Sequence, residues 1–185
     1  MFDAPTPAPA VLPDEVSQEI FMNLFTGEAA DELFGGDVPP HVRELLQQAR
    51  QAPAAEQAGL LWTAQACSPQ TLAVYYLLAK CHATRRELAL AERAARGGLQ
   101  QAAWQAGLPS DWTLVQPGAA DFQALGPARF WLFMLKALVF LRTRSGDGVQ
   151  ARQLLAKLQQ LDPSASVGSD VVAALVQSVP PGSGA

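Results

Sequence analysis

The most apolar stretch of the chain runs from Trp131 to Leu141, and Lys136 is its only charged residue. A helix that is apolar on every side is buried on every side. The run is too short to cross a bilayer, for which roughly 20 apolar residues are needed. It therefore predicts a central helix, between Gly126-Pro127 and Ser145-Gly146-Asp147, against which the other helices pack.

Elsewhere apolar residues recur every three or four positions, which is typical of amphipathic helices with one buried face. Residues that begin or end helices separate these segments. No segment alternates apolar and polar residues for long, so the chain is predicted to be all-α, with short links that make successive helices antiparallel. The predicted helices cover residues 14–25, 40–51, 54–67, 69–83, 86–104, 127–144, 148–161 and 170–178.

The same pattern divides the chain into an arm, a domain and a tail. Residues 1–36 are predicted to form an acidic N-terminal arm with short amphipathic helices, residues 37–178 a helical-repeat domain, and residues 179–185 a flexible tail. An insertion at 105–126 interrupts the domain. Turn-forming residues fill its 108–126 part, yet its large apolar side chains indicate that it packs down. Two roles are open, a cover over a hydrophobic gap and a functional loop. The apolar residues are Trp112, Leu114, Val115 and Phe122.

Charge is distributed unevenly along the chain, whose net charge is -4. Residues 1–60 carry ten acids and two bases, and residues 61–185 carry seven acids and eleven bases. The acidic balance argues against a general nucleic-acid binder. Two interpretations of the asymmetry are open. In the first interpretation, the acids form a solvated surface. In the second, residues 14–34 form an acidic amphipathic arm that docks on the basic body of the same chain or of a second copy. Docking on a second copy would make a homodimer. The arm's large apolar residues, which favour docking, are Ile20, Phe21, Leu24, Phe25, Leu33 and Phe34.

Residues that could carry chemistry are few. Cys67 and Cys81 have the spacing of neither a disulfide framework nor a zinc site, and both are predicted to be small core residues. His82 is predicted to lie in the core and His41 in solvent. Phosphate-binding glycine loops, metalloprotease motifs and nucleophile motifs are missing. We therefore expect no enzyme activity, no cofactor and no metal.

The N-terminus has no basic region followed by an apolar run, so it is not expected to be a signal peptide. No segment reaches the length of a membrane span. The expected location is the cytoplasm, without membrane association.

Three stretches follow one another like copies of a helix–turn–helix unit. The clearest begins at Leu135 and closes at Asp162-Pro163, with Gly146-Asp147 in its turn. A second covers residues 75–103, and a weaker third covers residues 41–69. Together they resemble tetratricopeptide repeats, although Val139 and Arg142 stand where that pattern has a small residue and Tyr. The resemblance covers residues 40–163 and implies an antiparallel helical-hairpin array with a C-terminal capping helix.

The run from Gly126 to Asp147, together with Leu161-Asp162-Pro163, also resembles small bacterial proteins encoded among nitrogen-fixation genes. This narrower resemblance implies an accessory role and gives no mechanism.

Tetratricopeptide-like proteins hold peptides in a groove lined by the first helix of each pair. The resemblance places Tyr76 and Lys80 in that groove from the second unit, and Lys136, Phe140 and Arg144 from the third. Residues four apart share a helix face, so the last three form a stripe of charge, aromatic and charge. Such a stripe suits an acidic-aromatic segment of a partner protein. The alternative is that Phe140 belongs to the core and the cations are ordinary solvated ends.

These expectations favour a protein-binding adaptor or a chaperone-like accessory protein, with bacterial nitrogen fixation as the setting that the narrower resemblance implies. The alternatives are a small-molecule or metallocofactor-handling accessory protein and a secretion-type chaperone. The scarcity of Cys and His argues against the metallocofactor alternative, because soft ligands are what such sites need.

Overall fold

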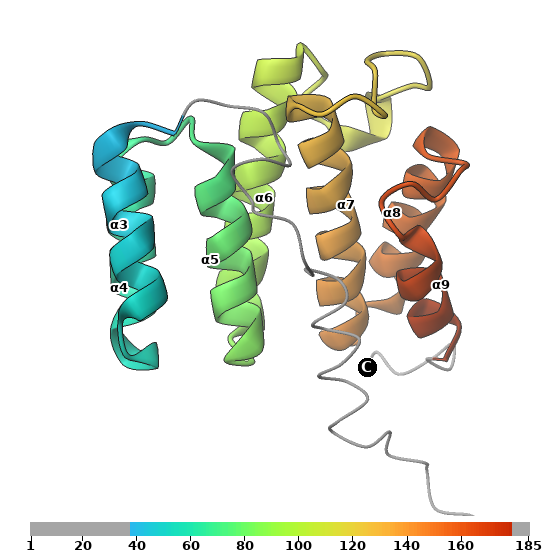
Figure 1. Ribbon diagram of the computed structural model, residues 1–185. Coiled ribbons are helices and arrows are strands. Elements are labelled where there is room, and N and C mark those ends of the chain that lie inside the picture. The colour runs from blue at the N-terminus through green and yellow to red at the C-terminus, as the bar shows by residue number, and fades with distance from the viewer. Residues whose placement is uncertain (1–37, 179–185) are drawn as a thin grey trace, which may run out of the picture.

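The computed structural model describes residues 38–178 of the chain, and these residues form helices and no strand (Figure 1). The prediction of an all-α chain is confirmed for this range. None of the helices in it is both long and apolar enough to span a membrane. The helices are α3 (Pro40–Gln51), α4 (Ala54–Cys67), α5 (Leu72–Thr84), α6 (Leu88–Ala106), the 3-10 turn η1 (Trp112–Leu114), α7 (Pro127–Arg144), α8 (Gly148–Leu161) and α9 (Ser169–Ser178).

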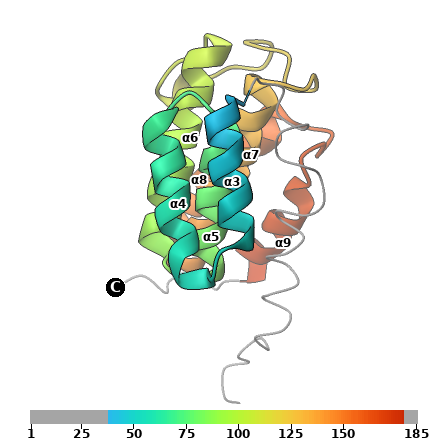
Figure 2. The same cartoon turned by 60° about the vertical axis from the view of Figure 1, so that its left-hand side comes forward.

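The helices follow one another in antiparallel order from α3 at one end of the molecule to α8 and α9 at the other (Figure 1). Two views show α3, α5 and α7 on one side and α4, α6 and α8 on the other (Figures 1 and 2). Each helix packs against the next, and α7 contacts α5, α6, α8 and α9. The prediction that 127–144 is the central helix is confirmed, because nearly all of its side chains from Phe130 to Leu141 are buried.

Three helices have boundaries that differ from the prediction, and the smallest difference is at α9, which begins at Ser169 rather than at residue 170. Helix α5 begins at Leu72 rather than at residue 69, because Ser68 and Thr71 form a turn in which their hydroxyl groups are 2.8 Å apart. Helix α6 begins two residues late and extends to Ala106. It ends where Gly107 takes a left-handed conformation, with φ of 66°, and the Leu108 N–H donates to the Ala103 carbonyl. This is a common way for glycine to close a helix. The insertion therefore begins at Gly107 and not at residue 105.

The turns of the α5–α6 and α7–α8 hairpins have the same construction, sixty residues apart. The Glu87 N–H donates to the carbonyl of His82, and the Asp147 N–H donates to the carbonyl of Arg142. In both turns the preceding residue has a left-handed backbone, with φ of 60° at Arg86 and 83° at Gly146. The backbone thus repeats the spacing that the sequence pattern indicated for these two units.

The insertion packs against the domain at three of the four apolar residues named above, Trp112, Val115 and Phe122. Val115 and Phe122 are buried, and the Phe122 ring lies 6.1 Å from the ring of Trp131 in α7. The Lys157 ammonium group of α8 donates to the Val115 carbonyl at 2.9 Å. Trp112 is half-buried. Leu114 contradicts the prediction, since 62% of its surface is exposed and only a single turn of 3-10 helix holds it.

Three further predictions concern individual residues. Cys81 is buried as expected, but Cys67 is exposed, because it is the last residue of α4 and nothing covers that end of the helix face. Val149, an apolar residue of the predicted helix over 148–161, lies in the first turn of α8 and is 63% exposed. The predictions for the acidic arm over 1–36, the helix over 14–25 and the tail over 179–185 lie outside the described residues.

Helix α6 approaches both α5 and α7 closely at Gly98. A Cβ atom at this position would come within 2.8 Å of the Tyr75 Cβ atom and 3.2 Å of the Met134 Sδ atom. The backbone of α6 can therefore approach both neighbours only because residue 98 has no side chain.

We expect Gly98→Ala to lower the free energy of unfolding by about 1–3 kcal/mol, as overpacking does. The matched control is Gly59→Ala in α4, where nothing lies within 4 Å of the added Cβ atom. That change should raise stability by about 0.5–1 kcal/mol through helix propensity alone. Urea denaturation of both variants measures the difference. Equal effects at the two positions would show that α6 does not pack this closely on α5 and α7.

Candidate functional site

The five residues predicted to line a groove do not form one exposed stripe. Tyr76, Lys136 and Phe140 are buried, Lys80 is half-buried and Arg144 is exposed. Burial raises the pKa of Tyr76 to about 12. Lys136 was predicted to offer a charge to solvent, and this is wrong, because its side chain is only 5% exposed. Partner binding by these residues stays a prediction.

Lys136 holds the turn that leads into α9. Its ammonium group donates to the Val167 carbonyl at 2.5 Å and lies 4.8 Å from the centre of the Phe133 ring. In the same turn the Val167 N–H donates to the Asp162 carboxylate at 3.0 Å. Burial acts to raise the pKa of Asp162, but hydrogen bonds from Val167, Ser166 and Gln123 outweigh it and lower that pKa. A buried cation and a buried carboxylate therefore fix the two ends of the turn.

The pKa of Lys136 is lowered from 10.5 to about 8. Burial is the largest cause, the nearby Arg129 charge also lowers the pKa, and the smaller effect of the Asp162 charge raises it. Between these two pH values Lys136 is protonated to a greater extent in the unfolded chain than in the folded chain. The free energy of unfolding contributed by Lys136 should therefore rise with pH in that range, by at most about 1.4 kcal/mol per pH unit.

The measurement compares the wild type with Lys136→Met by urea denaturation from about pH 7 to about pH 10. The raised pKa values of Tyr76 and Cys81 oppose the rise, but both groups are present in both proteins, so the difference between the proteins isolates Lys136. We expect the wild type to gain stability relative to the variant as pH increases. A difference that does not change with pH would contradict the lowered pKa of Lys136.

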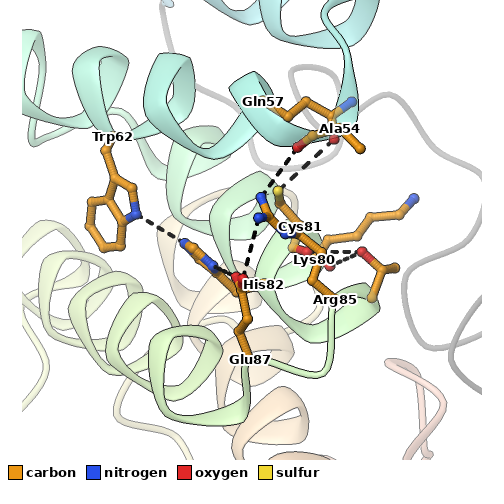
Figure 3. Close-up of polar contacts among 9 residues, drawn as sticks. Ala54, Gln57, Trp62, Lys80, Cys81, His82, Arg85 and Glu87 are labelled. Atoms are coloured by element: carbon orange, nitrogen blue, oxygen red, sulfur yellow. Dashed lines mark hydrogen bonds and ion pairs between the residues drawn. The ribbon is translucent and has the colours of Figure 1, made fainter.

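A polar chain connects α4, α5 and the turn before α6 (Figure 3). The Trp62 indole N–H donates to His82 Nε2 at 2.9 Å, and His82 Nδ1 lies 2.6 Å from the Glu87 carboxylate. An indole N–H can only donate, so His82 Nε2 accepts and Nδ1 carries the proton that is shared with Glu87. Arg85 extends the chain by pairing with Glu87 at 3.3 Å and donating to the Ala54 carbonyl at 3.2 Å. His82 is a satisfied core residue, as predicted, and it fixes the orientation of the Trp62 ring.

We expect His82→Ala to lower the free energy of unfolding by about 2–3 kcal/mol, because the Trp62 N–H and the Glu87 carboxylate lose their shared partner. His41→Ala is the matched control, since His41 is exposed on α3 and its loss should change stability by no more than about 0.5 kcal/mol. Thermal or urea unfolding separates the two variants. A His82→Ala effect as small as that of the control would show that the polar chain contributes little.

A second polar cluster joins α6 to the hairpin that follows it. Glu92 accepts from Arg96 at 2.6 Å within α6 and also from the guanidinium group of Arg142 in α7. Arg142 lies 3.5 Å from Asp147, and Arg96 donates to Gln150 at 3.2 Å. Two arginines thus neutralise the one carboxylate of Glu92, and the hairpins α5–α6 and α7–α8 are tied together on the α6 side.

An open groove of about 740 Å³ lies between α4 and α6, with Tyr75 of α5 behind it and the start of the insertion at one end. Trp62 and Gln65 form the α4 wall. Residues 89–100 of α6 form the opposite wall, where Arg93 and Gln100 are exposed. The complete lining is Trp62, Gln65, Tyr75, Ala89, Glu92, Arg93, Ala94, Arg96, Gly97, Leu99, Gln100, Ser110 and Trp112.

The groove brings together side chains that sequence reasoning did not connect. Arg93 lies over the face of Trp62, with its guanidinium carbon 5.3 Å from the ring centre. Residues 93, 97, 100 and 104 share one face of α6 by helical spacing. Trp104, which is 75% exposed, therefore continues this face beyond the groove. The spacing of Arg93, Gln100 and Trp104 was visible in the sequence, but their partner across the groove was not.

The lining of the groove offers groups that can bind a peptide. It combines indole faces, amide groups, a hydroxyl group and a guanidinium group, which together can hold apolar side chains and a peptide backbone. Within residues 38–178 no group of three or more His, Cys, Asp or Glu side chains is placed to hold a metal ion. Comparison with protein-family models, with curated proteins and with solved structures found no match to this chain.

Proposed function

We propose that the chain is a protein-binding adaptor or chaperone-like accessory protein, built on tetratricopeptide-like hairpins. The observation that carries the proposal is the groove between α4 and α6, because its lining can hold an extended peptide segment. The matching turns of the α5–α6 and α7–α8 hairpins support the repeat architecture.

The shape of the groove favours a peptide over a small molecule. Small-molecule sites bury most of the ligand surface inside a concave pocket. Here Ala89, Arg93, Gln100 and Ser110 are exposed, so the groove is open along one side. An extended segment can lie across such a surface and continue beyond it at both ends. The exposed Trp104 next to the groove offers a further apolar contact.

The walls of the groove are held in place from behind. His82 fixes the Trp62 ring, and the Glu92–Arg142 pair fixes the adjacent part of α6 against α7. A binding surface whose side chains are already ordered loses less conformational entropy when a partner docks. The proposed function therefore rests on a surface whose side chains are ordered before a partner binds.

Site-specific photo-cross-linking tests the proposal in the cells that naturally express the chain. A benzoylphenylalanine in place of Gln100, which is exposed in the groove, should give a discrete cross-linked species that contains a second protein. The same group in place of Gln153, which is exposed on α8, should not. Mass spectrometry of the bands identifies the partner. Equal cross-linking from both positions, or none from Gln100, would contradict the groove as the binding surface.

A further inference from the structure

Arg93 differs from its charged neighbours in the groove because no carboxylate among residues 38–178 pairs with it. The structure records no hydrogen bond or ion pair for Arg93 within residues 38–178, and its recorded contact is the face of Trp62. Arg96, by contrast, is paired with Glu92, and Glu92 is also paired with Arg142. Within residues 38–178 the groove therefore presents the Arg93 guanidinium group without a carboxylate partner, beside the Glu92 carboxylate, whose charge is already matched.

The contact with Trp62 prepares Arg93 for an anion. The guanidinium carbon lies over the indole ring at 5.3 Å from its centre, and cation–π contacts of this kind orient the side chain. The edge of the plane keeps its N–H donors, whose fork geometry matches the two oxygens of a carboxylate. Lysine could supply the charge but neither the fork nor the stacking.

The rest of the lining suits the neighbours of such a carboxylate in a peptide. Trp62 and Trp112 are both half-buried and offer indole surface to an apolar or aromatic side chain. The Gln65 amide N–H₂ donates to the Tyr75 hydroxyl group at 3.2 Å, which leaves the amide oxygen as an acceptor on the α4 wall. Gln100, exposed on the α6 wall, can donate to or accept from a peptide backbone.

We propose that the groove between α4 and α6 binds an acidic-aromatic segment of a partner protein, with an Asp or Glu carboxylate on Arg93 and an adjacent apolar side chain against the indole rings. This inference rests on the proposed function and adds the chemistry of the ligand and the side of the molecule that binds it. The occupied surface is then formed by the second helices of two successive hairpins.

Fluorescence anisotropy with the full chain tests the inference. The probe is a short fluorescein-labelled peptide in which Glu and Tyr alternate, and the matched probe carries Gln in place of every Glu. Four affinities form a double-mutant cycle: each peptide with the wild type and with Arg93→Gln. We expect the Glu peptide to bind the wild type about five- to tenfold more tightly than the Gln peptide, and Arg93→Gln to remove that preference.

Two further variants test whether the effect is specific to the arginine side chain and to its position in the groove. Arg93→Lys keeps the charge but should recover only part of the preference for Glu, because the fork and the stacking are lost. Arg152→Gln, an exposed arginine on α8 outside the groove, should leave both affinities unchanged. Circular dichroism confirms that each variant retains its helices.

The outcomes separate this inference from the proposed function. Equal binding of both peptides, or a Glu preference that survives Arg93→Gln, would overturn the carboxylate site while the groove could still bind protein. Absence of binding by both peptides, with a partner still cross-linked from position 100, would overturn the acidic ligand alone. A cross-link from position 100 to residues 1–37 of the same chain, or to a second copy, would overturn the partner protein as the occupant.

Discussion

The structure depends on the burial of α7. Its side chains from Phe130 to Leu141 are buried almost without interruption, so every side of the helix needs a neighbour. Helices α5, α6, α8 and α9 supply those neighbours. Each buried large apolar side chain contributes roughly 1.5–3 kcal/mol relative to exposure. The burial of α7 therefore requires that α5, α6, α8 and α9 assemble around it.

The same burial creates a polar requirement inside the core. Lys136 lies in the middle of α7, and its ammonium group would be unpaired without the Val167 carbonyl. That carbonyl belongs to the turn before α9, which Asp162 organises from the other end. Helix α9 is thus tied to the central helix by a specific hydrogen bond in the turn before it as well as by direct contact with α7. Deprotonation near the lowered pKa of Lys136 removes the cost of burying the charge.

The side chains that form the walls of the candidate groove are held in place by contacts behind them. His82 receives a hydrogen bond from Trp62 and shares a proton with Glu87, so the indole ring is held at an angle that lets Arg93 lie over it. On the other wall, Glu92 is held by Arg96 and Arg142. Contacts within the protein therefore leave the Arg93 guanidinium group as the charge that is available to the proposed ligand.

Local pattern determined the helices and the position of the most buried one. Apolar spacing identifies the face that a helix hides, and Pro, Gly and Asp mark where the chain turns, so the segments from Pro40 to Ser178 were predicted to within three residues. The repeat pattern predicted helical hairpins around His82-Glu87 and Arg142-Asp147, and the structure adds that their turns, sixty residues apart, have the same construction. What the pattern could not supply was the meeting of side chains from separate helices. Periodicity treats Lys136 as one exposed cation of a stripe, whereas the tertiary structure encloses it beneath the turn before α9.

The contact between Trp62 and Arg93 could not be predicted from the sequence either. The two residues are thirty-one positions apart, and no sequence pattern connects them. Only the packing of α4 and α6 on either side of α5 brings them together, because contact across a hairpin array depends on the angle and register of whole helices rather than on any local sequence.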